Sequence, residues 1–194
     1  VTAAERGLGE VEETGETFED NALLKAAAAW EASGGEMCLA DDSGLAVDAL
    51  DGAPGVYSAR FAGPQVSYAD NNRKLIEVLK DVPAERRGAA FVSTVAWLVP
   101  EAWVRADAVD GPWRRVRRPD VPAGAALFVV TGEVRGRILD HLRGAEGFGY
   151  DPLFLYEPAG LTFAELPAEA KHAVSHRGHA LAALRACVDA VLLP

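Results

Sequence analysis

The order of helical and strand-like segments restricts the fold of this 194-residue chain more than any other feature. In its first half, segments with helical spacing of apolar residues alternate with strand-like runs. Between residues 91 and 139, strand-like runs follow one another. This order predicts an α/β protein with a mixed sheet, because a purely doubly wound fold would alternate throughout. No long linker, repeat or low-complexity block interrupts the pattern, so we expect a single domain.

The boundaries of the predicted elements come from capping residues and turn residues. Thr17 as N-cap, with Asp20 reaching back to it, begins a helix that ends near Ser33 before Gly34-Gly35. Ser67 and Asp70 begin a second helix, and a third starts near Ser175. Strands are expected over 91–99, 125–130 and 133–139, with a short one ending near 156. The expected core faces of the three helices are Leu23, Ala27 and Trp30; Leu75, Ile76 and Leu79; and Leu181, Leu184, Val188 and Val191.

The composition limits the class of protein. Apolar residues make up 49% of the chain and charged residues 25%, as in ordinary globular proteins, and no apolar run approaches membrane-spanning length. A formal net charge of −10 argues against nonspecific binding of nucleic-acid polymers, but allows a small phosphorylated ligand in a locally basic site. Cys38 and Cys187 lie among apolar neighbours and are expected to be reduced thiols in a cytoplasmic protein.

An acidic motif, Leu39-Ala-Asp-Asp-Ser-Gly-Leu45, follows an expected core strand over 37–40, and Gly44 is expected to allow a sharp turn. Carboxylates at the carboxyl end of a strand are well placed to hold a divalent cation. Asp42 can bind such a cation or accept a proton from attacking water, and Ser43 can hydrogen-bond a ligand or cap the turn. Glu13 can share the cation, or it can be one of several surface acids. The alternative for the Asp pair is a solvated turn.

Two downstream motifs suggest recognition of a flat, anionic ligand. In Gly144-Ala-Glu-Gly-Phe-Gly-Tyr-Asp-Pro152 the glycines allow close backbone approach, Phe148 can stack on a base, and Asp151 can accept from a ring N–H. The alternative is a glycine-rich turn with Phe148 in the core. In Lys171-His-Ala-Val-Ser-His-Arg177, His176 and Arg177 would lie in the first helical turn, where cations are unfavourable unless an anion compensates them.

Two further features have competing interpretations. Lys25 lies off the apolar face of its helix and is either solvated or directed at the acidic segment that precedes the helix. Segment 101–124 carries Trp103, Trp113 and the run Arg114-Arg-Val-Arg-Arg118. Interleaved aromatics and arginines can bind nucleic acid, but a solvated loop on an acidic protein is the expected structure.

Taken together, the motifs resemble those of the Ham1-type inosine/xanthosine triphosphate pyrophosphatases. The matching segments occur in the family's order and span about residue 13 to residue 184. They are Glu13-Thr-Gly-Glu-Thr-Phe-Glu-Asp-Asn-Ala-Leu-Leu-Lys25, Ala40-Asp-Asp-Ser-Gly-Leu45, Gly52-Ala-Pro-Gly-Val-Tyr-Ser-Ala-Arg60, Asn71-Asn72, Gly147-Phe-Gly-Tyr-Asp-Pro152 and Ser175-His-Arg177.

The resemblance implies Mg²⁺-dependent hydrolysis of ITP, dITP and XTP to the monophosphate and pyrophosphate. It also implies a homodimer and an elongated mixed β-sheet flanked by helices, with two lobes around a central nucleotide cleft. Glu13 and Asp42 correspond to metal-associated acids, with Asp42 also the proton acceptor, and Lys25 and Ser43 would contact phosphates or sugar. The residues that would form the base-recognising wall are Phe148, Gly149, Tyr150, Asp151, Lys171, His176 and Arg177.

The sequence departs from the family pattern in two places. The family begins with a strand and a Thr/Ser-x-Asn-x-x-Lys loop that grips the triphosphate, and segment 101–124 is usually shorter. We expect residues to be missing before Val1, because loss of an N-terminal core strand would expose a sheet edge; otherwise phosphate binding is impaired. Two other functions are considered: a noncatalytic nucleotide-binding or sensing module, and a pyrophosphatase for other modified triphosphates.

Overall fold

The computed structural model describes residues 2, 4–106 and 111–192. The chain forms two compact units: unit 1 comprises Val1–Asp42, Ser93–Gly132 and Ala180–Pro194, and unit 2 comprises Ser43–Val92 and Glu133–His179. A six-stranded sheet has the strand order β1-β2-β4-β5-β6, and β3 pairs with β4 off this path. The strands are β1 (Cys38–Val47), β2 (Gly88–Pro100), β3 (Trp113–Val116), β4 (Ala125–Ile138), β5 (Phe154–Tyr156) and β6 (Leu161–Thr162). The predicted α/β class, with a sheet flanked by helices, is confirmed.

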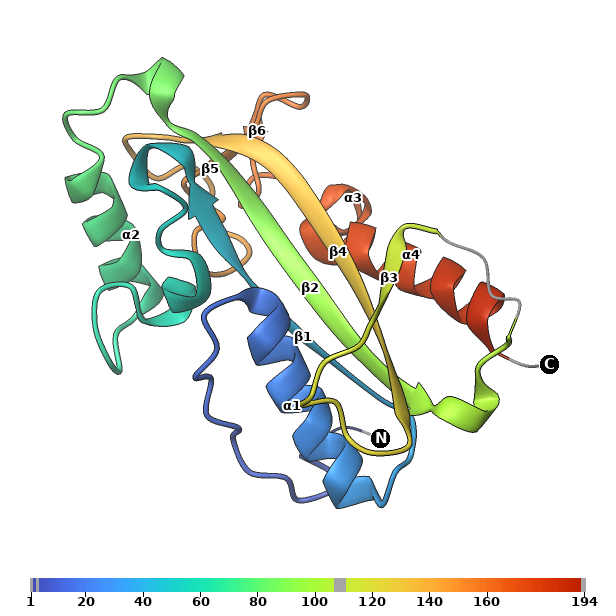
Figure 1. The fold of residues 1–194 in the computed structure, drawn as a ribbon. Helices are drawn as coiled ribbons and strands as arrows, with labels where there is room; N and C mark the ends of the chain where they lie inside the picture. The colour runs from blue at the N-terminus through green and yellow to red at the C-terminus, as the bar shows by residue number, and fades with distance from the viewer. Residues whose placement is uncertain (1, 3, 107–110, 193–194) are drawn as a thin grey trace. The chain divides into compact units, whose positions relative to one another are not determined.

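In unit 1, helices cover both faces of the sheet (Figure 1). Successive residues of a strand point to opposite faces of the sheet, and alternate residues of β2 accordingly pack against different helices. Ala96 and Leu98 pack with helix α1 (Phe18–Ser33), whereas Val95, Trp97 and Val99 pack with helix α4 (His176–Val191). Strand β4 alternates in the same way, and each face therefore buries its own apolar cluster.

Unit 2 has a separate core in which aromatic rings predominate. Phe91 on β2 stacks on Phe163 with ring centroids 5.7 Å apart, and Phe154 on β5 packs against both rings. Helix α2 (Tyr68–Val78) contributes Leu75 to this core, and Leu79 at its C-cap is also fully buried. The remaining helices are α3 (Ala168–Val174) and the 3₁₀ turns η1 (Asp48–Leu50), η2 (Gly55–Arg60), η3 (Ala84–Arg86) and η4 (Glu101–Trp103).

The predicted helix ends are confirmed. Thr17 caps α1 by accepting from the backbone N–H of Asp20, and Gly34 ends the helix in the left-handed conformation at φ 73°. Ser67 and Asp70 form a complete capping box at the start of α2. None of the helices in the described part of the chain has the length and apolar character needed to cross a bilayer.

Three strand and core predictions were wrong. Strand β1 runs through the acidic motif without a sharp turn at Gly44, because Leu45 and Val47 beyond it pack into the core of unit 2. Leu39 is 56% exposed, since β1 ends the strand order. Segments 125–130 and 133–139 belong to one strand, β4, which runs without interruption through both predicted segments as far as Ile138.

The apolar stripe of α4 also differs from its prediction. The buried residues are Ala180, Leu184, Cys187 and Val191, which recur at helical spacing along one face. Leu181 lies one residue beyond this stripe and is rotated away, so it is 47% exposed instead of buried. Val188 is only partly buried.

The cap of α1 supplies a stability test. Thr17→Ala removes the acceptor for the Asp20 N–H and should lower the free energy of unfolding by about 1 kcal/mol. Urea unfolding followed by circular dichroism measures the change. Thr17→Ser keeps the hydroxyl and should stay close to the wild-type value. Equal stability of the wild type and the alanine variant would show that the cap does not stabilise α1.

Candidate active site

Two acids from distant parts of the sequence meet at Lys25 in unit 1. The Lys25 ammonium donates to Glu13 Oε1 at 2.8 Å and to Asp42 Oδ1 at 3.0 Å. Lys25 extends from α1, Asp42 lies on β1, and Glu13 lies in the segment that leads into α1. All three side chains are at least two-thirds buried. The structure therefore brings together the three residues of unit 1 that the sequence selected.

Asn21 is a fourth member of this cluster, and the sequence analysis missed it. Its side chain is fully buried; it accepts from the Gly15 N–H at 2.8 Å and donates to Asp42 Oδ2 at 3.2 Å. A Cβ on Gly15 would lie 2.7 Å from Asn21 Oδ1, so glycine is required there. Asparagine is disfavoured in helix interiors. Its position beside the alanines and leucines of an apolar helix face is the sequence feature that could have indicated a buried polar role.

The electrostatics of the cluster suit a cation. Burial lowers the pKa of Lys25. The hydrogen bonds to Glu13 and Asp42 together raise that pKa by more than burial lowers it, so the net shift is upward. Lys25 therefore stays charged at neutral pH and keeps the two carboxylates from repelling each other. Carboxylate oxygens are the protein ligands that Mg²⁺ prefers. The ion usually binds one or two carboxylates and completes its coordination with phosphates and waters. Glu13 and Asp42 fit that requirement, although the described residues contain no cluster of three or more potential ligands.

A small aromatic and basic pocket lies in unit 2. It encloses about 190 Å³, and Ser43 of β1 contributes to its lining. Phe148 is 52% exposed and therefore does not lie in the core. The Lys171 ammonium and the Arg177 guanidinium lie 4.9 and 5.7 Å from the centre of the Phe148 ring, within cation–π range.

Asp151 connects the backbone at Phe148 to the side chain of Lys171. Its Oδ2 atom accepts from the backbone N–H of Phe148 at 2.7 Å and from the Lys171 ammonium at 2.5 Å. Gly147 has φ 81°, and a Cβ there would lie 2.2 Å from the same oxygen. The predicted acceptance from a ligand N–H remains a prediction, but Oδ2 already accepts two protein hydrogen bonds.

Tyr150 and Gly149 have largely structural contacts. Tyr150 is buried in the core of unit 2, its hydroxyl donates to the Ser58 carbonyl at 2.9 Å, and burial raises its pKa. Gly149 has φ 62° and offers its carbonyl to Asn72 Nδ2 at 2.9 Å. Both residues line the pocket, and their backbone shapes its wall.

His176 and Arg177 begin α4, as predicted. Ser175 Oγ accepts from the Gly178 N–H at 3.1 Å, which is the expected N-cap contact. His176 is buried and stacks on Phe91 with ring centroids 5.0 Å apart, whereas Arg177 is exposed. Lys171 comes from α3, a helix that the sequence analysis did not predict.

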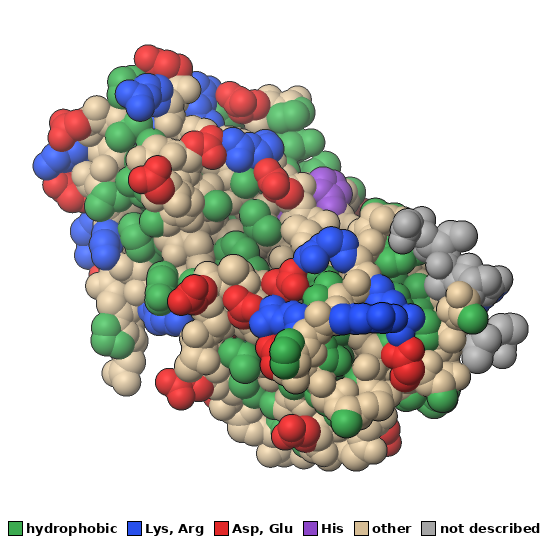
Figure 2. Space-filling view, viewed as in Figure 1, with side chains coloured by type: hydrophobic (Ala, Val, Ile, Leu, Met, Phe, Trp, Pro, Cys, Tyr) green, Lys and Arg blue, Asp and Glu red, His purple; other side chains and the backbone are tan. Residues whose placement is uncertain are grey.

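Three arginines of the run in segment 101–124 form ion pairs with acids. Part of the segment forms β3 instead of the expected solvated loop, and residues 107–110 lie outside the described residues. Arg114 pairs with Glu19, and Arg118 pairs with Asp20 at 2.6 Å. The Thr17 hydroxyl and then Arg118 hold the pKa of Asp20 below its ordinary value. Figure 2 shows basic and acidic side chains interspersed on one face of the molecule.

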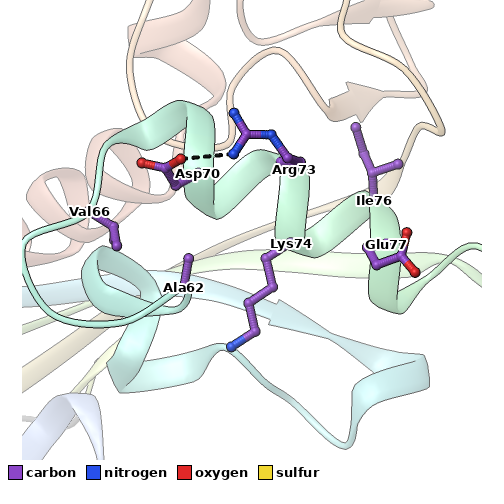
Figure 3. A pocket seen from close by; sticks show the side chains of 7 residues that line it. All are labelled: Ala62, Val66, Asp70, Arg73, Lys74, Ile76 and Glu77. Carbon is purple, nitrogen blue, oxygen red and sulfur yellow. Dashed lines mark hydrogen bonds and ion pairs between the residues drawn. The ribbon is translucent and has the colours of Figure 1, made fainter.

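A further hollow on the surface of α2 contains none of the predicted site residues (Figure 3). Two of its basic side chains already have partners within unit 2. Arg73 pairs with Asp70 at 2.9 Å, and Lys74 donates to the Phe61 carbonyl at 2.5 Å. We assign no role to this hollow.

The described part of the chain is an α/β protein with two carboxylates paired to the Lys25 ammonium and an aromatic pocket bordered by basic side chains. The Ham1 family model matches residues 2–187. A dITP/XTP pyrophosphatase from Geobacter sulfurreducens is 50% identical over 176 residues, covering 91% of this chain and 76% of the relative. The chain belongs to the Ham1 family.

Solved structures agree with this assignment. A HAM1 protein from Coxiella burnetii matches with TM-score 0.79 and 35% identity, covering 96% of this chain and 83% of that one. A nucleoside-triphosphatase / dITP/XTP pyrophosphatase from Mycobacterium abscessus matches with TM-score 0.69 and 46% identity, covering 91% and 78%. The family resemblance inferred from the motifs is therefore confirmed.

Asn21 allows a pH-dependent test of the acid cluster. Asn21→Asp replaces the donor to Asp42 with a like charge, so the folded protein holds the pKa of the new carboxylate above its unfolded value. The resulting loss of stability, about 2 kcal/mol or more near pH 7, should shrink as the pH falls through that raised pKa. Urea unfolding near pH 7 and near pH 5 measures it. Asn21→Ala adds no charge and should lose similar stability at both pH values; matching pH profiles for the two variants would contradict the prediction.

Proposed function

We propose that this protein hydrolyses the noncanonical purine nucleoside triphosphates ITP, dITP and XTP to the monophosphate and pyrophosphate, removing them from the nucleotide pool. The observation that carries the proposal is the family match over nearly the whole chain, with relatives named dITP/XTP pyrophosphatases at 50% and 46% identity. The site residues support it, because unit 1 carries acids suited to a metal and unit 2 carries a pocket suited to a base.

Divalent-metal dependence is expected of this family, and we propose Mg²⁺ as the ion. Glu13 and Asp42 would hold it, since their oxygens already converge on one positive charge. Bound Mg²⁺ supplies charge neutralisation at the phosphates and makes a bound water more acidic. Asp42 would accept the proton of the attacking water. Asn21 would orient the Asp42 carboxylate by donating to its Oδ2 atom. Lys25 and Ser43 would contact the phosphates or the sugar.

Base recognition is assigned to unit 2. Phe148 would stack on the purine, while Lys171, His176 and Arg177 would face its polar edge, together with the wall formed by Gly149, Tyr150 and Asp151. A site that hydrogen-bonds a 6-keto purine leaves polar groups unpaired when the 6-amino group of adenine enters. The cost of those unpaired groups would provide the discrimination against ATP.

The remaining proposals concern the state of the protein. The resemblance supports a homodimer, a cytoplasmic location and a single pyrophosphatase domain over residues 1–194. Cys38 and Cys187 are free thiols, and burial raises the pKa of Cys187 to about 12, which makes it unreactive. Neither cysteine is assigned a catalytic role.

Substrate comparison tests the proposed activity. The purified full-length protein with Mg²⁺ should turn over ITP with a kcat/KM at least about 100-fold above that for ATP, because unpaired polar groups penalise adenine. Separate assays for pyrophosphate and orthophosphate identify the product, and pyrophosphate is expected. Equal slow turnover of both nucleotides, or orthophosphate as the sole inorganic product, would refute the activity.

A nearly isosteric substitution that removes one carboxylate separates an enzyme from a noncatalytic binding module. Asp42→Asn should lower kcat for ITP by at least about 100-fold, because it removes the proton acceptor, while affinity changes much less. Asp41→Asn is the matched control, since adjacent strand residues point to opposite faces, and it should retain most of the activity. A wild-type protein that binds ITP without turnover would favour the binding module, and equal loss in both variants would contradict the assignment to Asp42.

A further inference from the structure

Tyr68 is an exposed aromatic residue that the proposed mechanism does not use. It is the first residue of α2 and is 56% exposed, although it lines the same pocket as Phe148. The two rings are 6.4 Å apart between centroids, with their planes tilted by 46°. Two large rings that line one pocket, each about half exposed, leave apolar surface available to a planar ligand.

The two rings are within contact range of each other, so a base can enter between them only if they separate slightly. Aromatic carbons pack at about 3.5 Å, so a flat base between two rings needs about 7 Å between them. The observed separation is slightly below that value. The rings are not parallel, but exposed side chains rotate on the picosecond to nanosecond timescale, and a small rotation of each ring would align them.

The elements that carry the two rings are tied to each other within unit 2. Asn72, one turn beyond Tyr68 on α2, donates to the carbonyl of Gly149, the residue after Phe148, at 2.9 Å. The capping box of Ser67 and Asp70 fixes the start of α2, and Asp151 fixes the backbone of Phe148. These hydrogen bonds fix the distance between the backbone at Tyr68 and the backbone at Phe148. The two exposed side chains can still change their rotamers.

We propose that Tyr68 is a second stacking wall, which encloses the purine base between its ring and that of Phe148. This inference rests on the proposed function and deepens it by naming a residue that selects for a flat, base-bearing ligand. Stacking is tolerant of base identity, because every base has a π-face. Tyr68 would therefore add affinity for any purine, whereas the polar edge contacts would choose among purines.

Direct binding of inosine 5′-monophosphate to the full-length protein, measured by isothermal calorimetry, tests the proposal. Tyr68→Ala should weaken binding about 10-fold, within the range that loss of one base-stacking contact produces. Tyr68→Phe should stay within about twofold of the wild type. Tyr68→Leu keeps apolar contact with Phe148 but has no flat face, and should behave like the alanine variant. Tyr57, exposed to a similar extent and absent from the pocket lining, supplies the control Tyr57→Ala, which should bind normally.

The outcomes separate the inference from the function on which it rests. Unchanged affinity in Tyr68→Ala, or leucine binding as well as phenylalanine, overturns the stacking role. A thermal midpoint that falls in Tyr68→Ala together with unchanged affinity assigns Tyr68 to structure and also overturns it. Wild-type protein that binds inosine 5′-monophosphate but does not hydrolyse ITP refutes the proposed activity while leaving the stacking result valid. Wild-type protein that hydrolyses ITP but does not bind inosine 5′-monophosphate overturns the stacking role and leaves the proposed activity standing.

Discussion

The ion pairing of Lys25 with Glu13 and Asp42 is the interaction on which the site in unit 1 depends. Each carboxylate alone would be an ordinary acid, and the two together would repel each other in a partly buried position. One ammonium from α1 removes that repulsion and ties the entering segment, the helix and β1 to a single point. The arrangement holds two carboxylates close together in the folded protein, and under the proposed function this would reduce the reorganisation needed to bind a metal ion.

In unit 2, hydrogen bonds hold the backbone on which the exposed rings of Phe148 and Tyr68 are carried. Asp151 is buried inside the glycine-rich turn, where it accepts hydrogen bonds from the Lys171 ammonium and the Phe148 N–H. The glycines permit left-handed backbone and leave space for that carboxylate. Phe148 is consequently held at the surface by its backbone, with cations against its face.

Local signals predicted much of the fold, and their failures have physical causes. Caps at Thr17 and Ser67 were correct because capping depends on residues three apart. The continuation of β1 beyond Asp42 was missed, because Gly44 looks like a turn residue until packing of Leu45 and Val47 holds the chain extended. The arginine run has the composition of a solvated loop, and no local pattern indicates its pairing, because its acidic partners Glu19 and Asp20 lie almost a hundred positions away.

The sequence by itself determined the family, the α/β class and the residue types available to the site, because ordered motifs and periodic apolar residues are properties of the chain. Only the tertiary structure decided which of those residues meet. It joined Glu13 to Asp42 through Lys25, added Asn21, and placed Tyr68 next to Phe148. The reason is that contacts between distant residues depend on how helices and strands pack, and no local pattern records that packing.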